Sequence, residues 1–318
     1  MTTKVGLVGL GVMGRNHLRV LEALADVSEV LVFDPLVQAE PSAKKTKSAH
    51  SLSEVLDSDL DYLVIATPTS THVEIATHAA RAGIPCLIEK PLAASLSEAL
   101  NLEREFVKTG AFVAIGHAER FNSSIVALKE KLDSGVLGAV YHVSTERVGP
   151  NPIRIRDVGV VLDLATHDLD LVQWVLGDSY IDLSATLTTQ AESDFEGLFV
   201  ANGRLSSGVS VSHNVNWLTP LKRREFSVLG ERGMLVADAL RAELRLYSMG
   251  SEEARWSAIE HMTGSVVGEE VKFALSFDEP LKLQHQAMAQ EIADRGETNI
   301  CKLGDAIGVL RIIDDFIY

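Results

Sequence analysis

The first third of the chain alternates short apolar runs with amphipathic helical patterns. Apolar residues at helical spacing predict three helices, at Met13–Leu24, His72–Ala82 and Ser95–Lys108. The apolar runs between them are of strand length and lie at Val5–Val8, Val30–Phe33, Tyr62–Ala66, Pro85–Ile88 and Phe112–Ile115. Strands that are apolar on both faces and alternate with helices are typical of a doubly wound parallel α/β sheet.

The pattern changes after Phe121. Beyond a helix expected at Ile125–Leu132, alternating stretches predict strands at Tyr141–Val143, Leu183–Leu187, Gly208–His213, Glu225–Leu229 and Leu244–Tyr247. One long helical pattern covers Val160–Leu176, and two more helices close the chain at Leu281–Asp294 and Asp305–Ile317. We therefore predict a Rossmann-like domain over residues 1–122 and an α+β domain with a large, mostly antiparallel open sheet over 123–318. The last helices can pack back on the first domain.

Charge and composition exclude several classes of protein. The net charge of −15 gives an acidic chain without a basic patch, which argues against binding to nucleic acid. Two distant cysteines, Cys86 and Cys301, make no disulfide framework and fit a reducing cytoplasm. No apolar run is long enough to span a bilayer, and the N-terminus has the pattern of a strand rather than of a signal peptide.

A phosphate-binding loop is indicated directly after the first predicted strand. Gly9, Gly11 and Gly14 form a G-x-G-x-x-G segment with Val12 and Met13, and a predicted helix follows. The glycines would allow a tight turn, close approach of a pyrophosphate and close packing of helix on strand. Asp34 ends the second strand, where a carboxylate would accept hydrogen bonds from the ribose hydroxyls of NAD and repel the 2′-phosphate of NADP. NAD is therefore expected as the cofactor, in preference to NADP.

Four further segments give the chain a resemblance to the Gfo/Idh/MocA oxidoreductase family. They are Ile88–Leu92 with its Glu-Lys-Pro, Ala66–Pro68 followed by His72, Gly116–Asn122, and the D-x-x-x-H of Asp163–His167. The chain departs from the family's pattern at Ser123, where many relatives have proline. It departs again at Val160 and Val161, where many have smaller residues.

The resemblance implies a dehydrogenase acting on CH–OH groups, with Lys90, His167 and Asp163 as catalytic residues. Asp163 and His167 are four apart, so on a helix both would share one face, with Asp170 a lesser candidate partner. Which of Lys90 and His167 is the base stays open, and His167 could instead be a core histidine. The residues expected to bind the cofactor are Gly9, Gly11, Val12, Met13, Gly14, Asp34, Thr67, Pro68, His72, Glu89 and Lys90.

For the substrate we expect a sugar or nucleotide sugar. The residues expected to bind it are Arg120, Asn122, Arg154, Arg156, Asp163 and His167, although Arg120 and Asn122 could equally be structural contacts. The arginines suit a diphosphate. The stretch that carries Arg154 and Arg156, together with Gly116–Asn122, resembles a nucleotide-sugar branch of the family that includes UDP-N-acetylglucosamine 3-dehydrogenases. The preferred substrate is therefore a UDP-N-acetylhexosamine that reacts at C3.

The alternatives are an inositol or free-sugar dehydrogenase, an NAD-recycling glycosidase, and a non-catalytic dinucleotide-sensing regulator. The resemblance also implies a homodimer or homotetramer formed through the C-terminal sheet. Leu183–Leu187 and Val209–Val211 could line that interface or belong to the core.

Overall fold

The computed structural model describes residues 2–37, 45–151, 158–189, 194–249 and 267–317. The chain forms two compact units, the first of Met1–Phe121 with Asp278–Asp314 and the second of Asn122–Phe277 with Asp315–Tyr318. Two of the residues predicted to bind substrate, Arg154 and Arg156, lie outside the described residues.

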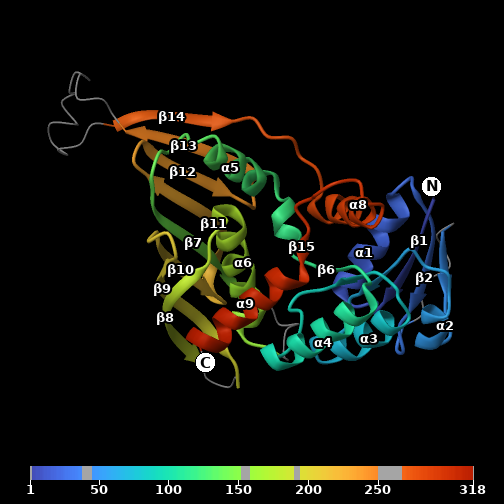
Figure 1. Cartoon of the computed structure of the whole chain (residues 1–318). Coiled ribbons are helices and arrows are strands. Elements are labelled where there is room, and N and C mark those ends of the chain that lie inside the picture. The colour runs from blue at the N-terminus through green and yellow to red at the C-terminus, as the bar shows by residue number, and fades with distance from the viewer. Residues whose placement is uncertain (1, 38–44, 152–157, 190–193, 250–266, 318) are drawn as a thin grey trace. The chain divides into compact units, whose positions relative to one another are not determined.

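The first unit is built on a seven-stranded sheet of order β15-β6-β5-β4-β1-β2-β3 (Figure 1). Neighbouring strands run parallel except β15, which is antiparallel to β6, so the prediction of a doubly wound parallel sheet is confirmed. The strands are β1 (Thr3–Val8), β2 (Val27–Phe33), β3 (Thr46–Ser48), β4 (Tyr62–Ile65), β5 (Cys86–Ile88), β6 (Val113–Ile115) and β15 (Cys301–Lys302). The pattern did not predict β3 and β15, because both are very short and carry polar residues.

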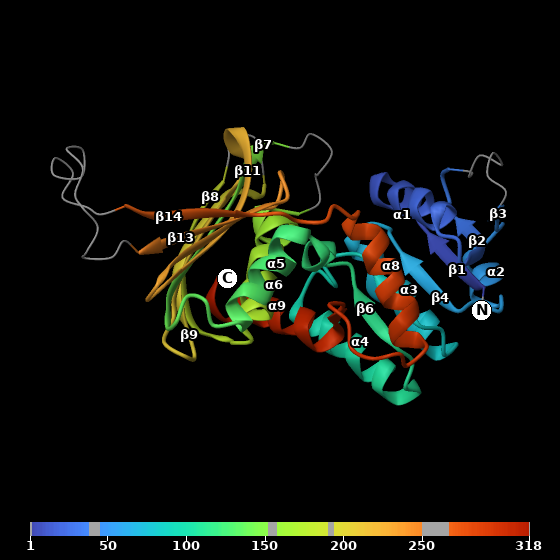
Figure 2. The same cartoon turned by 90° about the horizontal axis from the view of Figure 1, so that it is seen from above.

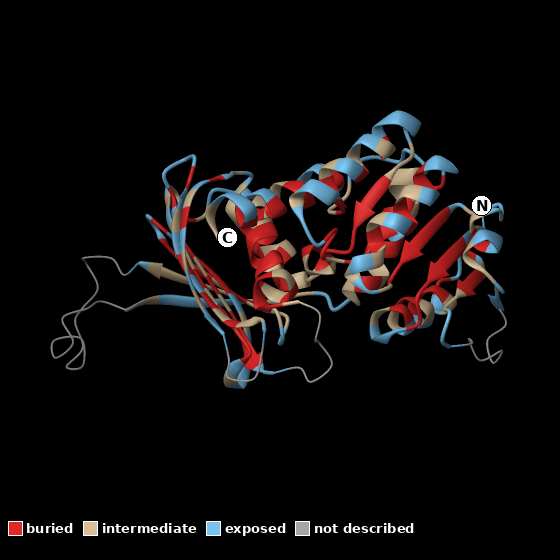
Figure 3. Ribbon diagram, turned by 90° about the horizontal axis from the view of Figure 1, so that it is seen from below, coloured by how far each residue is buried: buried red, intermediate tan, exposed pale blue. Residues whose placement is uncertain are grey.

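Helices cover this sheet, and its central strands are buried along nearly their whole length (Figure 3). The described helices of the unit are α1 (Val12–Ala23), α2 (Leu52–Leu56), α3 (Thr69–Arg81), α4 (Leu96–Thr109), the 3-10 turn η1 (Ala118–Phe121), α8 (Pro280–Ile292) and most of α9 (Leu303–Phe316). Leu281 and Met288 of α8 join Leu7 and Leu21 in one buried cluster. The C-terminal part of the chain thus completes the core of the N-terminal sheet.

Helix α4 begins and ends within one residue of the range that the sequence predicts. The Ser95 side chain accepts a hydrogen bond from the Glu98 backbone N–H at 3.3 Å, and the Glu98 carboxylate accepts one from the Ala94 N–H at 3.1 Å. These two bonds satisfy backbone donors that the first turn of a helix leaves without partners. Gly110 ends the helix in the left-handed conformation.

The second unit is built on an eight-stranded sheet of order β14-β13-β12-β11-β7-β10-β9-β8. Neighbours are antiparallel except β7 and β10, which confirms a mostly antiparallel sheet. Helices α5 (Ser123–Asp133) and α6 (Thr166–Leu176) lie on one face (Figure 2). The strands are β7 (Val140–Pro150), β8 (Tyr180–Thr189), β9 (Glu196–Leu205), β10 (Ser210–Asn216), β11 (Leu218–Gly230), β12 (Gly233–Asp238), β13 (Glu243–Met249) and β14 (Val267–Phe273).

Three of these strands, β9, β12 and β14, were not predicted, and β7 is much longer than expected. Gly203 interrupts the apolar pattern of β9, yet the sheet needs glycine there, since a Cβ would lie 2.2 Å from the Asp182 carbonyl oxygen. In β7 the inward residues Thr145 and Arg147 are polar, which hides the alternation. Leu183 and Val211 are buried in the core.

The long helix predicted over Val160–Leu176 is wrong in one respect. Val161–Ala165 forms a π-helical turn, and a regular α-helix, α6, begins only at Thr166. The Thr166 hydroxyl donates to the Leu162 carbonyl oxygen at 3.0 Å. The π-helical segment is only 5 residues long, which is too short for its longer repeat to be recognised in the apolar pattern. No helix in the described ranges is long and apolar enough to cross a membrane.

Candidate active site

The glycine loop between β1 and α1 has a separate physical reason for each glycine. Gly9 has a φ of +97°, and a Cβ there would lie 2.5 Å from the Ala66 carbonyl oxygen. A Cβ on Gly14 would lie 1.9 Å from the Gly9 carbonyl oxygen, so this glycine lets the helix lie against the loop. A Cβ on Gly11 would meet no described atom within 4 Å. No packing contact therefore requires glycine at position 11, which lines a pocket beside the loop.

The N-terminus of α1 is available to an anion. Gly11 is its N-cap and provides no side-chain hydrogen bond, and no acidic residue lies in the first turn. Backbone N–H groups at such a terminus, together with the helix dipole, favour a phosphate.

Asp34 follows β2 and faces this loop. Its Oδ2 accepts a hydrogen bond from the Leu10 N–H at 2.7 Å, and its Oδ1 accepts from the N–H groups of Leu36 and Val37 at 2.8 and 2.9 Å. Partial burial alone would raise the pKa of Asp34, but these three hydrogen bonds and the nearby Arg15 outweigh it and lower the pKa. The carboxylate is therefore charged and fixed in position.

A pocket of about 610 Å³ lies over the carboxyl ends of β1, β2 and β4. In a doubly wound sheet this is the edge where ligands bind. Of the residues predicted to bind the cofactor, those that line the pocket are Gly9, Gly11, Asp34, Thr67 and Pro68. The lining does not include Val12, Met13, Gly14, His72, Glu89 and Lys90.

Sequence reasoning missed several lining residues, including Arg15, Leu36, Val37, Thr71 and Ile75. Arg15 directly follows the last glycine of the loop, so its position in the motif was a usable signal. The others line the pocket through the shape of loops and of α3, which no residue pattern reports.

His72 joins two loops at the same edge of the sheet. Its Nδ1 lies 2.9 Å from the Pro91 carbonyl oxygen and its Nε2 lies 2.9 Å from the Thr67 carbonyl oxygen. Two acceptors favour the protonated ring, but burial opposes the charge and, on balance, lowers the pKa of His72. The side chain is almost completely buried, so it supports the loop of Thr67 and the turn after Lys90 from within.

Lys90 lies in the turn after β5, directly after the buried Glu89. The Lys90 backbone N–H donates to the Glu89 Oε2 at 3.2 Å, which holds the start of the turn. Gly116, which follows β6, is needed beside it, because a Cβ there would lie 2.9 Å from the Glu89 Oε1. The Lys90 side chain is only partly buried.

In the second unit, Asp163 and His167 lie on either side of the change from π-helix to α-helix. Asp163 is in the π-helical turn and is buried, and His167 is in the first turn of α6 and is partly exposed. Single π-turns inside helices occur frequently at functional sites. The turn therefore adds a structural signal to a pair chosen from sequence alone.

Arg120 and Asn122 both make structural contacts. The Arg120 side chain is 4% exposed, and its Nη1 donates to Asp305 Oδ2 at 3.0 Å within the first unit. In the second unit the Asn122 Oδ1 accepts from the Ser124 N–H at 3.0 Å and so caps α5, and its Nδ2 donates to the Ala239 carbonyl oxygen at 2.9 Å. Both residues therefore have a structural contact in their own unit, and their part in binding substrate stays a prediction.

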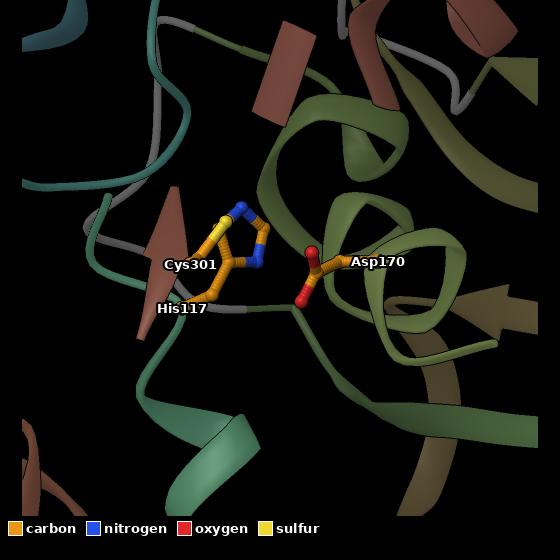
Figure 4. Close-up of side chains that lie close together, drawn as sticks. All are labelled: His117, Asp170 and Cys301. Atoms are coloured by element: carbon orange, nitrogen blue, oxygen red, sulfur yellow. The ribbon is translucent and has the colours of Figure 1, made fainter. Parts of the chain in front are cut away.

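The close-up in Figure 4 labels His117, Cys301 and Asp170. His117 follows β6, and Cys301 pairs with Ile115 across the β15–β6 ladder, so both belong to the same edge of the first sheet. Asp170 is buried on α6 of the second unit.

Two family models match the chain. Residues 3–117 match the oxidoreductase family with an NAD-binding Rossmann fold, and residues 125–236 match the Gfo/Idh/MocA C-terminal domain. The fold and the loop define an NAD-binding oxidoreductase. The chain belongs to the Gfo/Idh/MocA family, as its motifs predicted, and it is a dehydrogenase that acts on CH–OH groups.

Known relatives include enzymes with different named substrates. The UDP-N-acetylglucosamine 3-dehydrogenase of Acidithiobacillus ferrooxidans is 28% identical over 248 residues, which are 78% of this chain and 78% of the relative. Inositol 2-dehydrogenase 2 of Paenarthrobacter aurescens is 30% identical over 228 residues, 65% of this chain and 68% of the relative. A solved structure of the Acidithiobacillus enzyme has a TM-score of 0.83 at 24% identity and covers 99% of this chain and 97% of that chain. At that identity the structural likeness supports the fold alone.

Proposed function

We propose that this protein is an NAD-dependent dehydrogenase that transfers a hydride between nicotinamide and a carbinol carbon of a sugar or nucleotide sugar. The observation that carries the proposal is the open space at Gly11 beside the charged carboxylate of Asp34, within one pocket. A dinucleotide needs this combination of room for its phosphates and an acceptor for its ribose.

NAD is proposed over NADP because of the state of Asp34. A carboxylate that stays charged repels a 2′-phosphate, while its oxygens can still accept from ribose hydroxyls. We propose that NAD is held by those predicted residues that line the pocket, with Arg15 added. His72 and Glu89 would act by supporting the loops around the cofactor.

Lys90, His167 and Asp163 are proposed as the catalytic residues. Bound NAD would supply the hydride acceptor. Oxidation of a carbinol also releases the hydroxyl proton, which a base of near-neutral pKa removes best. An imidazole with a carboxylate one helical turn away suits that role, and an ammonium group suits stabilisation of the developing alkoxide. We assign removal of the hydroxyl proton to His167 and stabilisation of the developing alkoxide to Lys90.

As the preferred substrate we propose a UDP-N-acetylhexosamine oxidised at C3. Support comes from the 28% identical relative with this named activity and from the arginines at 154 and 156, whose residue type suits a diphosphate. An inositol is the second candidate, because inositol dehydrogenases are similarly related.

Initial rates of NADH formation test the function. The assay uses the whole protein with NAD and, in turn, UDP-N-acetylglucosamine, N-acetylglucosamine, glucose and myo-inositol. We expect turnover with the nucleotide sugar that is lost in Lys90→Met and His167→Asn. Turnover with myo-inositol alone would overturn the substrate, and silence on all four while NAD binds would favour an NAD-recycling glycosidase or a dinucleotide-sensing regulator.

We also propose a homodimer or homotetramer that pairs the open face of the second sheet, and a cytoplasmic setting. The face opposite α5 and α6 carries the half-exposed apolar residues Val200, Leu229, Met234 and Val236. The cytoplasmic setting is proposed because Cys86 and Cys301 are buried thiols and form no disulfide with each other. Light scattering of wild type and of a Leu229→Glu variant would test the assembly, which the variant should weaken.

A further inference from the structure

A chain of four buried polar side chains crosses the first unit and ends at Glu89. The Tyr62 hydroxyl lies 2.9 Å from His285 Nδ1, His285 Nε2 lies 2.9 Å from His17 Nδ1, and His17 Nε2 lies 2.8 Å from Glu89 Oε1. The four side chains come from β4, α8, α1 and the end of β5, and each residue is at most 5% exposed. Buried polar groups need partners, and here the two histidines take both of their partners from within the chain.

The direction of every hydrogen bond follows from the charge of Glu89. Burial alone would raise the pKa of Glu89, but the hydrogen bond from His17 and the positive charge of Lys90 outweigh it and lower the pKa. A carboxylate only accepts, so His17 Nε2 donates to it. With a neutral ring, His17 Nδ1 then accepts from His285 Nε2, and His285 Nδ1 accepts from the Tyr62 hydroxyl.

The opposite arrangement leaves a donor without an acceptor. If His17 were doubly protonated, its Nδ1 would donate to His285 and the His285 Nδ1–H would donate to the Tyr62 oxygen. The Tyr62 hydrogen would then have no acceptor, because His285 is the hydroxyl's one hydrogen-bond partner within the described structure. An unsatisfied buried donor is costly. Burial also lowers the pKa of His285 well below its usual value and raises that of Tyr62, as two neutral groups require.

Three donors therefore point the same way, toward one negative charge. Hydrogen bonds in a row polarise one another, so each strengthens the next. At the far end of the chain, burial and the negative charges of Asp26 and Asp61 oppose ionisation of the Tyr62 hydroxyl. The near end, at Glu89, is charged and lies beside Lys90 and His72.

We propose that Tyr62, His285 and His17 are positioning residues, which fix Glu89 as a carboxylate under the turn of Lys90 and thereby hold Lys90 ready for its reaction. No member is assigned contact with substrate. The kinetic part of this inference rests on the proposed function, whereas the protonation pattern does not.

Histidine nitrogen NMR of the whole ¹⁵N-labelled protein tests the pattern without any turnover. Because His17 Nε2 donates to Glu89 and His285 Nε2 donates to His17, we expect both rings to carry their hydrogen at Nε2, with Nδ1 as an acceptor. Protonation of either ring at Nδ1 would overturn the proposal.

A pair of tyrosine variants adds a matched control. Tyr62→Phe removes the last donor of the chain and should shift the His285 Nδ1 resonance and, less, that of His17. Tyr180→Phe removes the hydroxyl of another buried tyrosine, which lies 2.9 Å from His213 Nε2 in the second unit, and should move neither. Equal effects of the two variants would contradict a directed chain. If Tyr62→Phe does not fold, the tautomers of His17 and His285 in the wild-type protein still test the proposal.

Steady-state kinetics of His17 variants then test whether the chain positions Lys90 through Glu89. His17→Leu should lower kcat about tenfold and move the acid limb of the kcat profile, with little change in NAD affinity, while His17→Gln, which keeps a donor, should recover most of the rate. Equal losses in both variants, or a loss confined to KM, would overturn the positioning role. If wild type turns over no substrate, the proposed function fails, and the NMR result still decides the protonation pattern.

Discussion

Arg147 donates a hydrogen bond through Nε to Asp168 Oδ1 at 2.7 Å, and the two side chains are only 5% and 3% exposed. The pair links β7 to α6, the helix that carries His167. A buried ion pair is weak evidence of net stability, but the loss of one partner leaves an uncompensated charge in the core.

Arg147→Met should therefore destabilise the second unit by about 3–5 kcal/mol. Urea unfolding measures this, and the double variant Arg147→Met/Asp168→Leu should recover a large part, since no lone charge remains. Arg204→Met is the matched control, because the Arg204–Asp182 pair is 61% and 46% exposed and should contribute less than about 1 kcal/mol. Similar losses from both arginines would contradict the argument.

Gly116→Ala should be destabilising although the backbone tolerates a side chain there. The new Cβ would lie 2.9 Å from the Glu89 Oε1 and Cδ and 3.1 Å from its Cα, so the carboxylate must move. We expect a loss of about 1–3 kcal/mol in denaturant unfolding, as for other overpacked sites. The control is Gly304→Ala in α9, where a Cβ meets nothing within 4 Å, and a stable Gly116→Ala protein with unaltered Glu89 would refute the expectation.

Asp34→Ala should weaken NAD binding about tenfold to a hundredfold, because hydrogen bonds to a charged acceptor are lost. NADP binding should weaken less or improve, since the repulsion of a 2′-phosphate goes with the carboxylate. Titration calorimetry with both dinucleotides gives the ratio, and Asp34→Asn separates the loss of charge from the loss of shape. An unchanged NAD-to-NADP ratio would speak against Asp34 as the selective group.

As the pH is lowered, the free energy of unfolding should begin to decrease at a pH well above the range where carboxylates titrate. Burial lowers the pKa of His213 from 6.5 to about 4. Below pH 6.5 the unfolded chain therefore binds a proton that the native state does not, and the free energy of unfolding decreases by up to about 3 kcal/mol as pH falls toward the folded pKa. The lowered pKa values of His285 and His72 act in the same direction.

Chemical denaturation at about pH 7 and about pH 5 measures this slope. His213→Gln should flatten it, whereas His50→Gln, at an exposed histidine, should leave it unchanged. A slope that does not respond to His213→Gln would mean that other groups carry the acid sensitivity.

Sequence alone predicted the first unit well, because its strands are apolar on both faces and its loop carries a glycine pattern with one physical meaning. It predicted the second unit less well. There the buried positions include Thr145, Arg147 and His213, whose polarity is satisfied by partners distant in sequence, so periodicity underestimates burial.

The candidate site shows the same limit. Gly9, Gly11 and Asp34 follow from spacing, whereas the partners of Glu89 do not. His17 is 72 residues from Glu89 and His285 is 268 residues from His17, and nothing local to either histidine indicates its neighbour. The π-turn before His167 is equally invisible, since a single turn is too short for its longer repeat to appear in the apolar pattern.

Hydride transfer from a nucleotide sugar to bound NAD can be measured in a single turnover. The whole protein in excess over NAD is mixed with UDP-N-acetylglucosamine, and the near-ultraviolet absorbance of reduced nicotinamide is followed. We expect NADH in wild type and none in Lys90→Met, although both bind NAD. No NADH in wild type with NAD bound, or equal NADH in the variant, would contradict this expectation.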